Sequence, residues 1–194
     1  MNGTAPAKRI LIVEDETIIR LDLRSMLEAS GYEVCGEAAD GLEAIELAAS
    51  LEPDVILMDV KMPKLDGIEA ARRILERRSV PIVMLTAFGQ EELVSRAVDT
   101  GVFGYLAKPF REQDVVPALV AAQTRHAEFS EVKLQADSLR EALEARKTIE
   151  RAKGILMAKE GISEDEAFAR LRRASQKSGR PMKVIADAVA ATLG

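Results

Sequence analysis

The chain has 194 residues, 47 % of them hydrophobic and 30 % charged, so it has enough apolar surface for one or two packed domains and is not wholly disordered. One cysteine and one histidine exclude a disulfide framework and a metal site built from several such side chains, and no apolar run is long enough to span a membrane. The net charge is −5 and the N-terminus lacks a secretory signal, so we expect a soluble protein in the reducing cytoplasm, with no membrane partner.

Short apolar runs alternate with helix-like segments along the first two thirds of the chain. The expected strands are 9–13, 33–37, 54–58, 80–85 and 103–107, and the expected helices are 17–29, 40–50, 66–77, 90–100 and 112 onward. The runs DVILM and VPIVML are almost wholly apolar, as is typical of strands buried on both faces. The alternation therefore predicts an α/β domain with a doubly wound, five-stranded parallel sheet.

Polar side chains occur where four of these strands end. Glu14 and Asp15 follow the first strand, Asp59 the third, Thr86 the fourth and Lys108 the fifth. Ligands of such sheets bind beyond the carboxyl ends of the strands, so we expect these side chains at one edge. Clustered carboxylates without Cys or His favour a hard cation, and Mg²⁺ fits best. A carboxylate nucleophile beside Mg²⁺, a hydroxyl and a lysine suits phosphoryl transfer, with Asp59 attacking in line.

These landmarks resemble the receiver domain of two-component response regulators, over about residues 7–125. The resemblance rests on Glu14-Asp15, on Asp59 within MDVKMPKLDG, on Thr86-Ala87 and on Lys108-Pro109-Phe110. The family often has two aspartates where this chain has Glu14-Asp15, a common variation. The resemblance implies a flavodoxin-like fold and a sensor histidine kinase as the source of the phosphoryl group.

The resemblance also implies a role for each matching residue. Asp59 would be the phosphoacceptor, and Mg²⁺ would be held by Glu14, Asp15, Asp59 and the backbone carbonyl of Lys61. Thr86 would donate a hydrogen bond to the phosphoryl group, and Lys108 would pair with it. Tyr105 matches the aromatic switch position of the family, although a tyrosine here is also compatible with an ordinary, partly buried strand residue.

The last helix of the receiver does not end where the domain should. Apolar or small residues recur every three or four positions, at Val115, Ala118, Ala122, Phe129, Val132, Ala136, Leu139 and Leu143. No glycine occurs from 105 to 153, so the pattern predicts one long helix with a heptad seam, in which 126–146 is a linker. A lone helix cannot bury such a seam, so we expect it to pair with a second chain or with the folded-back tail. The many alanines predict weak self-association.

Residues 147–194 are predicted to form a small all-α domain of three helices. The first continues to Gly161, Ser163 and Glu166 form a capping box that starts the second, and Gly179 ends it. The third helix is expected over 182–192. The apolar residues expected to be buried at helical spacing are Ile155, Ala167, Phe168, Leu171, Ile185 and Val189.

Charge divides the chain in the same way. Residues 1–139 contain 15 Lys and Arg against 24 Asp and Glu, whereas residues 140–194 contain 12 against 8. A basic tail is compatible with a nucleic-acid-binding surface and also with ordinary solvated helix faces.

Four segments of the tail resemble the ANTAR output domain, over about residues 140–192. They are RAKGILM at 151–157, GIS at 161–163, EAF at 166–168 and LRRAS at 171–175. The resemblance implies a dimeric, three-helix RNA binder that acts in transcription antitermination on paired RNA hairpins. The candidate RNA-binding residues are Arg151, Lys153, Gly154, Arg170, Arg173, Lys177 and Arg180. We expect Lys153, Arg173 and Lys177 to lie off the apolar face.

Together these patterns predict a response regulator with a receiver domain at 1–125, a helical linker at 126–146 and an ANTAR domain at 147–194. Phosphorylation on Asp59 would control RNA binding, and phosphorylation or RNA would favour a homodimer. The chain is not expected to be an enzyme with a separate substrate. Two alternatives remain: a tail that binds protein or DNA, and a receiver that passes its phosphoryl group onward as a phosphorelay intermediate.

Overall fold

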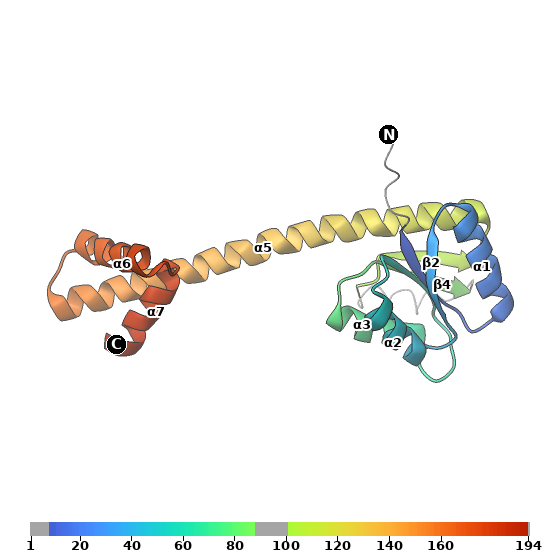
Figure 1. Ribbon diagram of the computed structural model, residues 1–194, viewed down its shortest axis with the longest axis horizontal. Coiled ribbons are helices and arrows are strands. Elements are labelled where there is room, and N and C mark those ends of the chain that lie inside the picture. The colour runs from blue at the N-terminus through green and yellow to red at the C-terminus, as the bar shows by residue number, and fades with distance from the viewer. Residues whose placement is uncertain (1–7, 88–100, 194) are drawn as a thin grey trace. The chain divides into compact units, whose positions relative to one another are not determined.

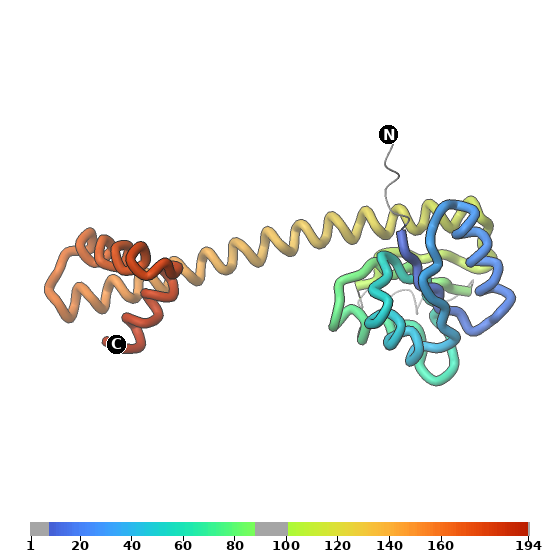
Figure 2. The backbone as a smooth tube through the Cα atoms, viewed as in Figure 1, coloured from blue at the N-terminus to red at the C-terminus, as the bar shows by residue number. Residues whose placement is uncertain are grey.

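A computed structural model describes residues 8–87 and 101–193 of the chain. The chain divides into two compact units at the boundary between Phe129 and Ser130, and each unit is described by itself. Figure 2 follows the backbone through both. Within the described residues, no helix combines the length and apolar character needed to cross a membrane.

The first unit is built on one parallel sheet of five strands. The strands are β1 (Arg9–Val13), β2 (Glu33–Ala38), β3 (Val55–Asp59), β4 (Ile82–Ala87) and β5 (Gly104–Lys108). Their order across the sheet is β2-β1-β3-β4-β5, and every neighbouring pair is parallel. The predicted five-stranded parallel sheet is therefore confirmed.

Helices cover both faces of this sheet (Figure 1). The described helices are α1 (Thr17–Ala29), α2 (Gly41–Leu51), α3 (Gly67–Arg77), α5 (Glu112–Glu160), α6 (Glu164–Ser178) and α7 (Met182–Leu193). Alternate strand residues face opposite ways, so Ile10 and Ile12 pack with α1 and α5, and Leu11 and Val13 pack with α2 and α3. The doubly wound, flavodoxin-like fold is confirmed. The helix expected at 90–100 lies outside the described residues.

Local sequence explains how α3 begins beside the end of β3. The Asp66 carboxylate accepts a hydrogen bond from the backbone N–H of Glu69 and so caps the helix. Gly67 follows, and a Cβ there would lie 1.9 Å from the backbone oxygen of Asp59. Only glycine allows so close an approach, and the Gly67 N–H donates to the carbonyl of Val60 at 2.9 Å. The loop after Asp59 is thereby fixed against α3.

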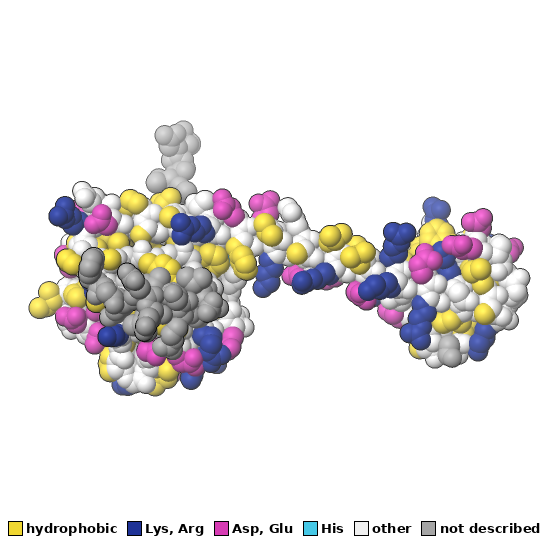
Figure 3. All heavy atoms as spheres, turned by 180° about the vertical axis from the view of Figure 1, so that it is seen from behind, with side chains coloured by type: hydrophobic (Ala, Val, Ile, Leu, Met, Phe, Trp, Pro, Cys, Tyr) yellow, Lys and Arg dark blue, Asp and Glu magenta, His cyan; other side chains and the backbone are white. Residues whose placement is uncertain are grey.

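Helix α5 has 49 residues, which confirms the predicted long helix. Its first turns pack on the sheet, where Val115, Leu119 and Ala122 are buried. Further along, four large apolar side chains on the predicted seam are each more than half exposed: Phe129, Val132, Leu139 and Leu143. Figure 3 shows apolar side chains at the surface along this helix. We call these four residues the exposed stripe.

The second unit packs the end of α5 against α6 and α7. The predicted capping box is confirmed, since Ser163 and Glu166 each bond to the backbone of the other, and Gly179 ends α6 with a φ of 67°. The fully packed core consists of Ala152, Leu156, Ala167, Leu171 and Ala186. Alanine at three of these five positions lets the helices approach closely.

One predicted core residue is wrong. Phe168 is 43 % exposed, because it follows the buried Ala167 and each helical step turns the side chain by about 100°. Ile155, Ile185 and Val189 are half-buried, at the margin of the alanine-rich core.

Candidate functional site

Three carboxylates meet at the carboxyl edge of the sheet. Glu14 and Asp15 follow β1, and Asp59 is the last residue of β3, the strand beside it. Each offers an oxygen, and these oxygens lie within 4.8 Å of one another. Glu14 and Asp59 are buried and Asp15 is exposed, so the cluster opens to solvent on one side. Such a group can coordinate one small cation.

Lys108 joins this cluster from the end of β5. Its Nζ donates a hydrogen bond to Oδ2 of Asp59 at 2.8 Å and lies 2.7 Å from Oε2 of Glu14. The contact with Glu14 is an ion pair without hydrogen-bond geometry, so among the described residues this buried oxygen receives no hydrogen bond. The ammonium therefore offsets two negative charges, while one buried oxygen of Glu14 still lacks a hydrogen bond.

Burial governs the electrostatics of the site. Removal from water raises the pKa of Glu14, and the negative charge of Asp59 raises it further, while Lys108 opposes both effects. Burial also acts to lower the pKa of Lys108, but its hydrogen bond to Asp59 and its charge interactions with Asp59 and Glu14 outweigh this and raise it. The three carboxylates supply only oxygen donors, and this donor set fits Mg²⁺.

The remaining predicted receiver residues lie on the neighbouring strands and the following loop. Thr86 is buried near the end of β4, and Tyr105 is half-buried in β5, where burial raises its pKa. Tyr105 is in register with Met84, and Thr86 is two residues further along β4, so Thr86 and Tyr105 belong to the same face of the sheet. Lys61 is exposed, two residues after Asp59.

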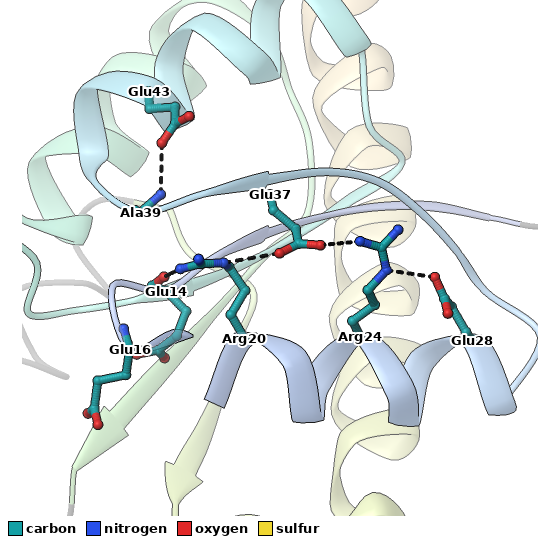
Figure 4. Close-up of polar contacts among 8 residues, drawn as sticks. All are labelled: Glu14, Glu16, Arg20, Arg24, Glu28, Glu37, Ala39 and Glu43. Atoms are coloured by element: carbon teal, nitrogen blue, oxygen red, sulfur yellow. Dashed lines mark hydrogen bonds and ion pairs between the residues drawn. The ribbon is translucent and has the colours of Figure 1, made fainter. Parts of the chain in front are cut away.

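A second set of residues, which the sequence analysis missed, holds the backbone of Glu14. Arg20 of α1 donates from Nη1 to the carbonyl oxygen of Glu14 at 2.5 Å and from Nε to Glu37 of β2 at 3.0 Å (Figure 4). Arg24 bonds to Glu37 and Glu28 but not to Glu14. No local spacing signals these contacts, because they join α1 to β2 and to the end of β1.

The predicted RNA-binding residues of the second unit differ in their partners. Lys153 is only 8 % exposed, and its ammonium contacts Glu150 at 2.9 Å and Glu164 at 2.6 Å. The expectation that Lys153 lies off the apolar face is therefore wrong, because it lies on the flank of α5 that faces α6, where its ammonium reaches Glu164. Arg170 pairs with Glu160.

The other basic candidates are free for a ligand. Arg151, Arg173, Lys177 and Arg180 are exposed, and no carboxylate of the described chain pairs with them. Figure 3 shows Lys and Arg side chains at several places on the surface of this unit. Gly154 is also exposed, within α5.

Comparison with known proteins defines the class. Residues 10–120 match the family model of the response regulator receiver domain, and residues 137–189 match that of the ANTAR domain. The chain therefore belongs to the two-component response regulators that carry a receiver domain and an ANTAR domain. It is 48 % identical over 190 residues to the transcriptional regulatory protein PdtaR of Mycobacterium tuberculosis, covering 98 % of this chain and 93 % of PdtaR.

Two of the solved structures similar to this chain are receiver domains. One is the signal receiver domain of a modulated diguanylate cyclase from Desulfovibrio desulfuricans G20, with 34 % identity, a TM-score of 0.58, and coverage of 62 % of this chain and 97 % of that one. Another is the receiver domain of the sensor histidine kinase PA1611 of Pseudomonas aeruginosa PAO1, which has a magnesium ion coordinated in its active-site cleft. It shares 35 % identity with a TM-score of 0.56, over 61 % of this chain and 98 % of that one.

Proposed function

We propose that phosphorylation of Asp59 by a sensor histidine kinase controls RNA binding and transcription antitermination by this chain. The observation that carries the proposal is the carboxylate cluster bridged by Lys108, in a chain that also has an ANTAR domain. We divide the chain into a receiver at 1–125, a linker at 126–146 and an RNA-binding domain at 147–194. The cytoplasm, which holds both transcripts and the ATP that kinases use, is the proposed compartment.

In the receiver, Asp59 acts as the nucleophile. One of its carboxylate oxygens attacks the phosphorus of a kinase phosphohistidine, the new P–O bond forms as the P–N bond breaks, and the histidine nitrogen leaves with the electron pair. Glu14, Asp15, Asp59 and the Lys61 carbonyl would hold Mg²⁺, which when bound offsets negative charge on the phosphoryl oxygens. The receiver would later hydrolyse its own acyl phosphate and has no separate substrate.

The residues around Asp59 then change position in response to the phosphoryl group. Lys108 already contacts Asp59, so its ammonium needs only a short movement to pair with a phosphoryl oxygen. The Thr86 hydroxyl donates a hydrogen bond to another phosphoryl oxygen, and Tyr105, on the same face of the sheet, changes position with Thr86. The changed surface favours a homodimer.

In the ANTAR domain, the unpaired cations bind RNA hairpins. Arg151, Arg173, Lys177 and Arg180 supply phosphate contacts without first breaking an ion pair. Lys153 and Arg170 belong to the same set, but a phosphate must displace their carboxylate partners before either cation is available. Two such domains in a dimer engage two hairpins, and the second contact gains from the high effective concentration.

The test begins with Asp59→Asn, which keeps the size of the side chain but removes the nucleophile. Labelled acetyl phosphate should modify the wild-type chain and the control Asp22→Asn, an exposed aspartate of α1, but not Asp59→Asn. Crosslinking to total cellular RNA should then recover discrete hairpins from the phosphorylated wild type and far less RNA from Asp59→Asn.

Three results would contradict the proposal. Equal labelling of Asp59→Asn and the wild type would remove the acceptor assignment. Failure of the phosphorylated wild type to retain any RNA would contradict the proposed RNA-binding function. If duplex DNA competes for the protein as well as the recovered RNA does, the ANTAR domain has been assigned the wrong class of nucleic acid.

A further inference from the structure

Gly154 is a glycine within a helix whose neighbours in the described part of the chain leave open space around it. It lies inside α5, where glycine weakens a helix relative to alanine. A Cβ built on Gly154 would have no atom within 4 Å, whereas a Cβ on Gly67 would collide with the backbone of Asp59. Within residues 8–87 and 101–193, neither packing nor backbone conformation requires glycine at position 154.

The residues around Gly154 form an open surface. The exposed residues within two turns of Gly154 on the same side of α5 are Lys147, Glu150, Arg151, Met157 and Ala158. The Glu150 carboxylate is already paired with Lys153. Ala152 and Leu156, on the opposite side, are buried in the core. Helical side chains lean toward the N-terminus, so Met157 and Ala158 border Gly154 while Arg151 leans away from it. The backbone at Gly154 is therefore open to a molecule from outside.

Charge decides between two occupants, an RNA and a second copy of this chain. A second helix requires apolar positions, but the heptad pattern of the exposed stripe continues beyond Leu143 with Arg146, Glu150 and Lys153. RNA requires cations, and Arg151 has no carboxylate partner among the described residues. The surface around Gly154 therefore suits RNA.

We propose that Gly154 lets an unpaired base of an RNA hairpin loop lie directly against the backbone of α5. Loop bases are free of stacking partners and offer a flat face. Met157 supplies an adaptable apolar wall, and Arg151 pairs with the adjoining phosphate. This inference rests on the proposed RNA-binding function and names the contact through which that function selects unpaired bases.

The experiment uses the full-length chain and a fluorescent synthetic RNA of the hairpin that crosslinks most strongly to the wild type. Gly154→Ala should raise the melting temperature, because alanine favours the helix, and weaken binding by roughly tenfold or more, because one added methyl displaces the base. The control is Ser138→Ala, which also favours α5 at an exposed position and should leave RNA affinity unchanged.

Three outcomes would overturn the inference. If Gly154→Ala binds the hairpin as tightly as the wild type does, no base lies at Gly154. The proposed RNA-binding function is then unaffected, because the wild type still retains RNA. If Gly154→Ala instead weakens self-association of the RNA-free chain in sedimentation velocity, with unchanged affinity per dimer, the occupant is a second copy. If the wild type retains no RNA, the proposed function fails and this contact fails with it.

Discussion

Two lysines of this chain each lie between two carboxylates, with different consequences. Lys108 contacts Asp59 and Glu14 at an edge that is open to solvent, where under the proposed mechanism its ammonium pairs with a phosphoryl group. Lys153 contacts Glu150 of its own helix and Glu164 at the start of α6, so its ammonium ties two helices together. The residue type is the same, but only the first lysine contacts the proposed nucleophile.

His126, the only histidine of the chain, predicts a pH dependence of stability. Its Nε2 lies 2.8 Å from the Ser79 hydroxyl, and its ring packs edge-on against Phe103. Burial, and then the charge of Arg78, lower its pKa. The unfolded chain therefore takes up a proton more readily, and stability contributed by the neutral ring is lost as the pH falls below about 6.5.

Urea unfolding at about pH 7.5 and pH 5.5 measures this effect. The wild type should lose more unfolding free energy over this range than His126→Gln, which has no titrating ring and can still bond to Ser79. Other carboxylates titrate in both proteins, so the difference between them isolates His126. Parallel pH profiles for the two proteins would show that the ring does not contribute.

At the scale of elements, the periodicity of apolar residues predicted every described strand to within two residues. The shift in β4 has a physical cause: Pro81 belongs to the apolar run but has no N–H, so the strand begins at Ile82. The rule that ligands bind at strand ends led to Glu14, Asp59 and Lys108, because parallel strands bring their carboxyl ends to one edge.

These rules do not predict which side chains make contacts between different helices and strands. Lys153 and Phe168 lie on the flanks of their helices. The periodicity of apolar residues does not predict which flank packs against an alanine-rich core. The contact from Arg20 to the Glu14 carbonyl depends on how α1 packs against β2. It cannot be predicted from the spacing of residues along the chain. Residues that position a site are therefore harder to predict than the residues that form it.

The Arg20 contact predicts a measurable effect on metal binding. Arg20→Ala removes the donor that holds the Glu14 backbone, and Mg²⁺ affinity measured by calorimetry should fall by about tenfold, as for other partners of metal ligands. Arg24→Ala is the matched control, since it also loses an ion pair with Glu37 but does not touch Glu14. Equal losses in the two variants would assign the effect to Glu37 alone.

For the whole molecule, the exposed stripe of α5 is the surface through which two copies are expected to associate. Phosphorylation and RNA should each increase the dimer fraction, because both favour the same state and linkage is reciprocal. Sedimentation velocity with beryllofluoride as the phosphoryl mimic, with and without the recovered RNA, measures this fraction. A fraction that neither addition changes would rule out the coupling.

A paired substitution on α5 locates the contact. Leu139→Ser removes an apolar side chain from the exposed stripe and should lower the dimer fraction. Leu134→Ser is the matched control, because Leu134 is equally large and exposed but lies outside the heptad positions. If both variants associate as the wild type does, the copies meet through another surface.

The exposed stripe has a consequence for how a cell uses this regulator. Under the proposed mechanism, a contact made by only four large apolar residues would be too weak to persist at low abundance. Pairing is second order in the number of chains, so doubling the copy number of dilute chains about quadruples the number of pairs. Under the proposed mechanism, gene dosage and proteolysis would determine how strongly RNA binding responds to phosphorylation. The same kinase signal would have little effect in a cell with few copies.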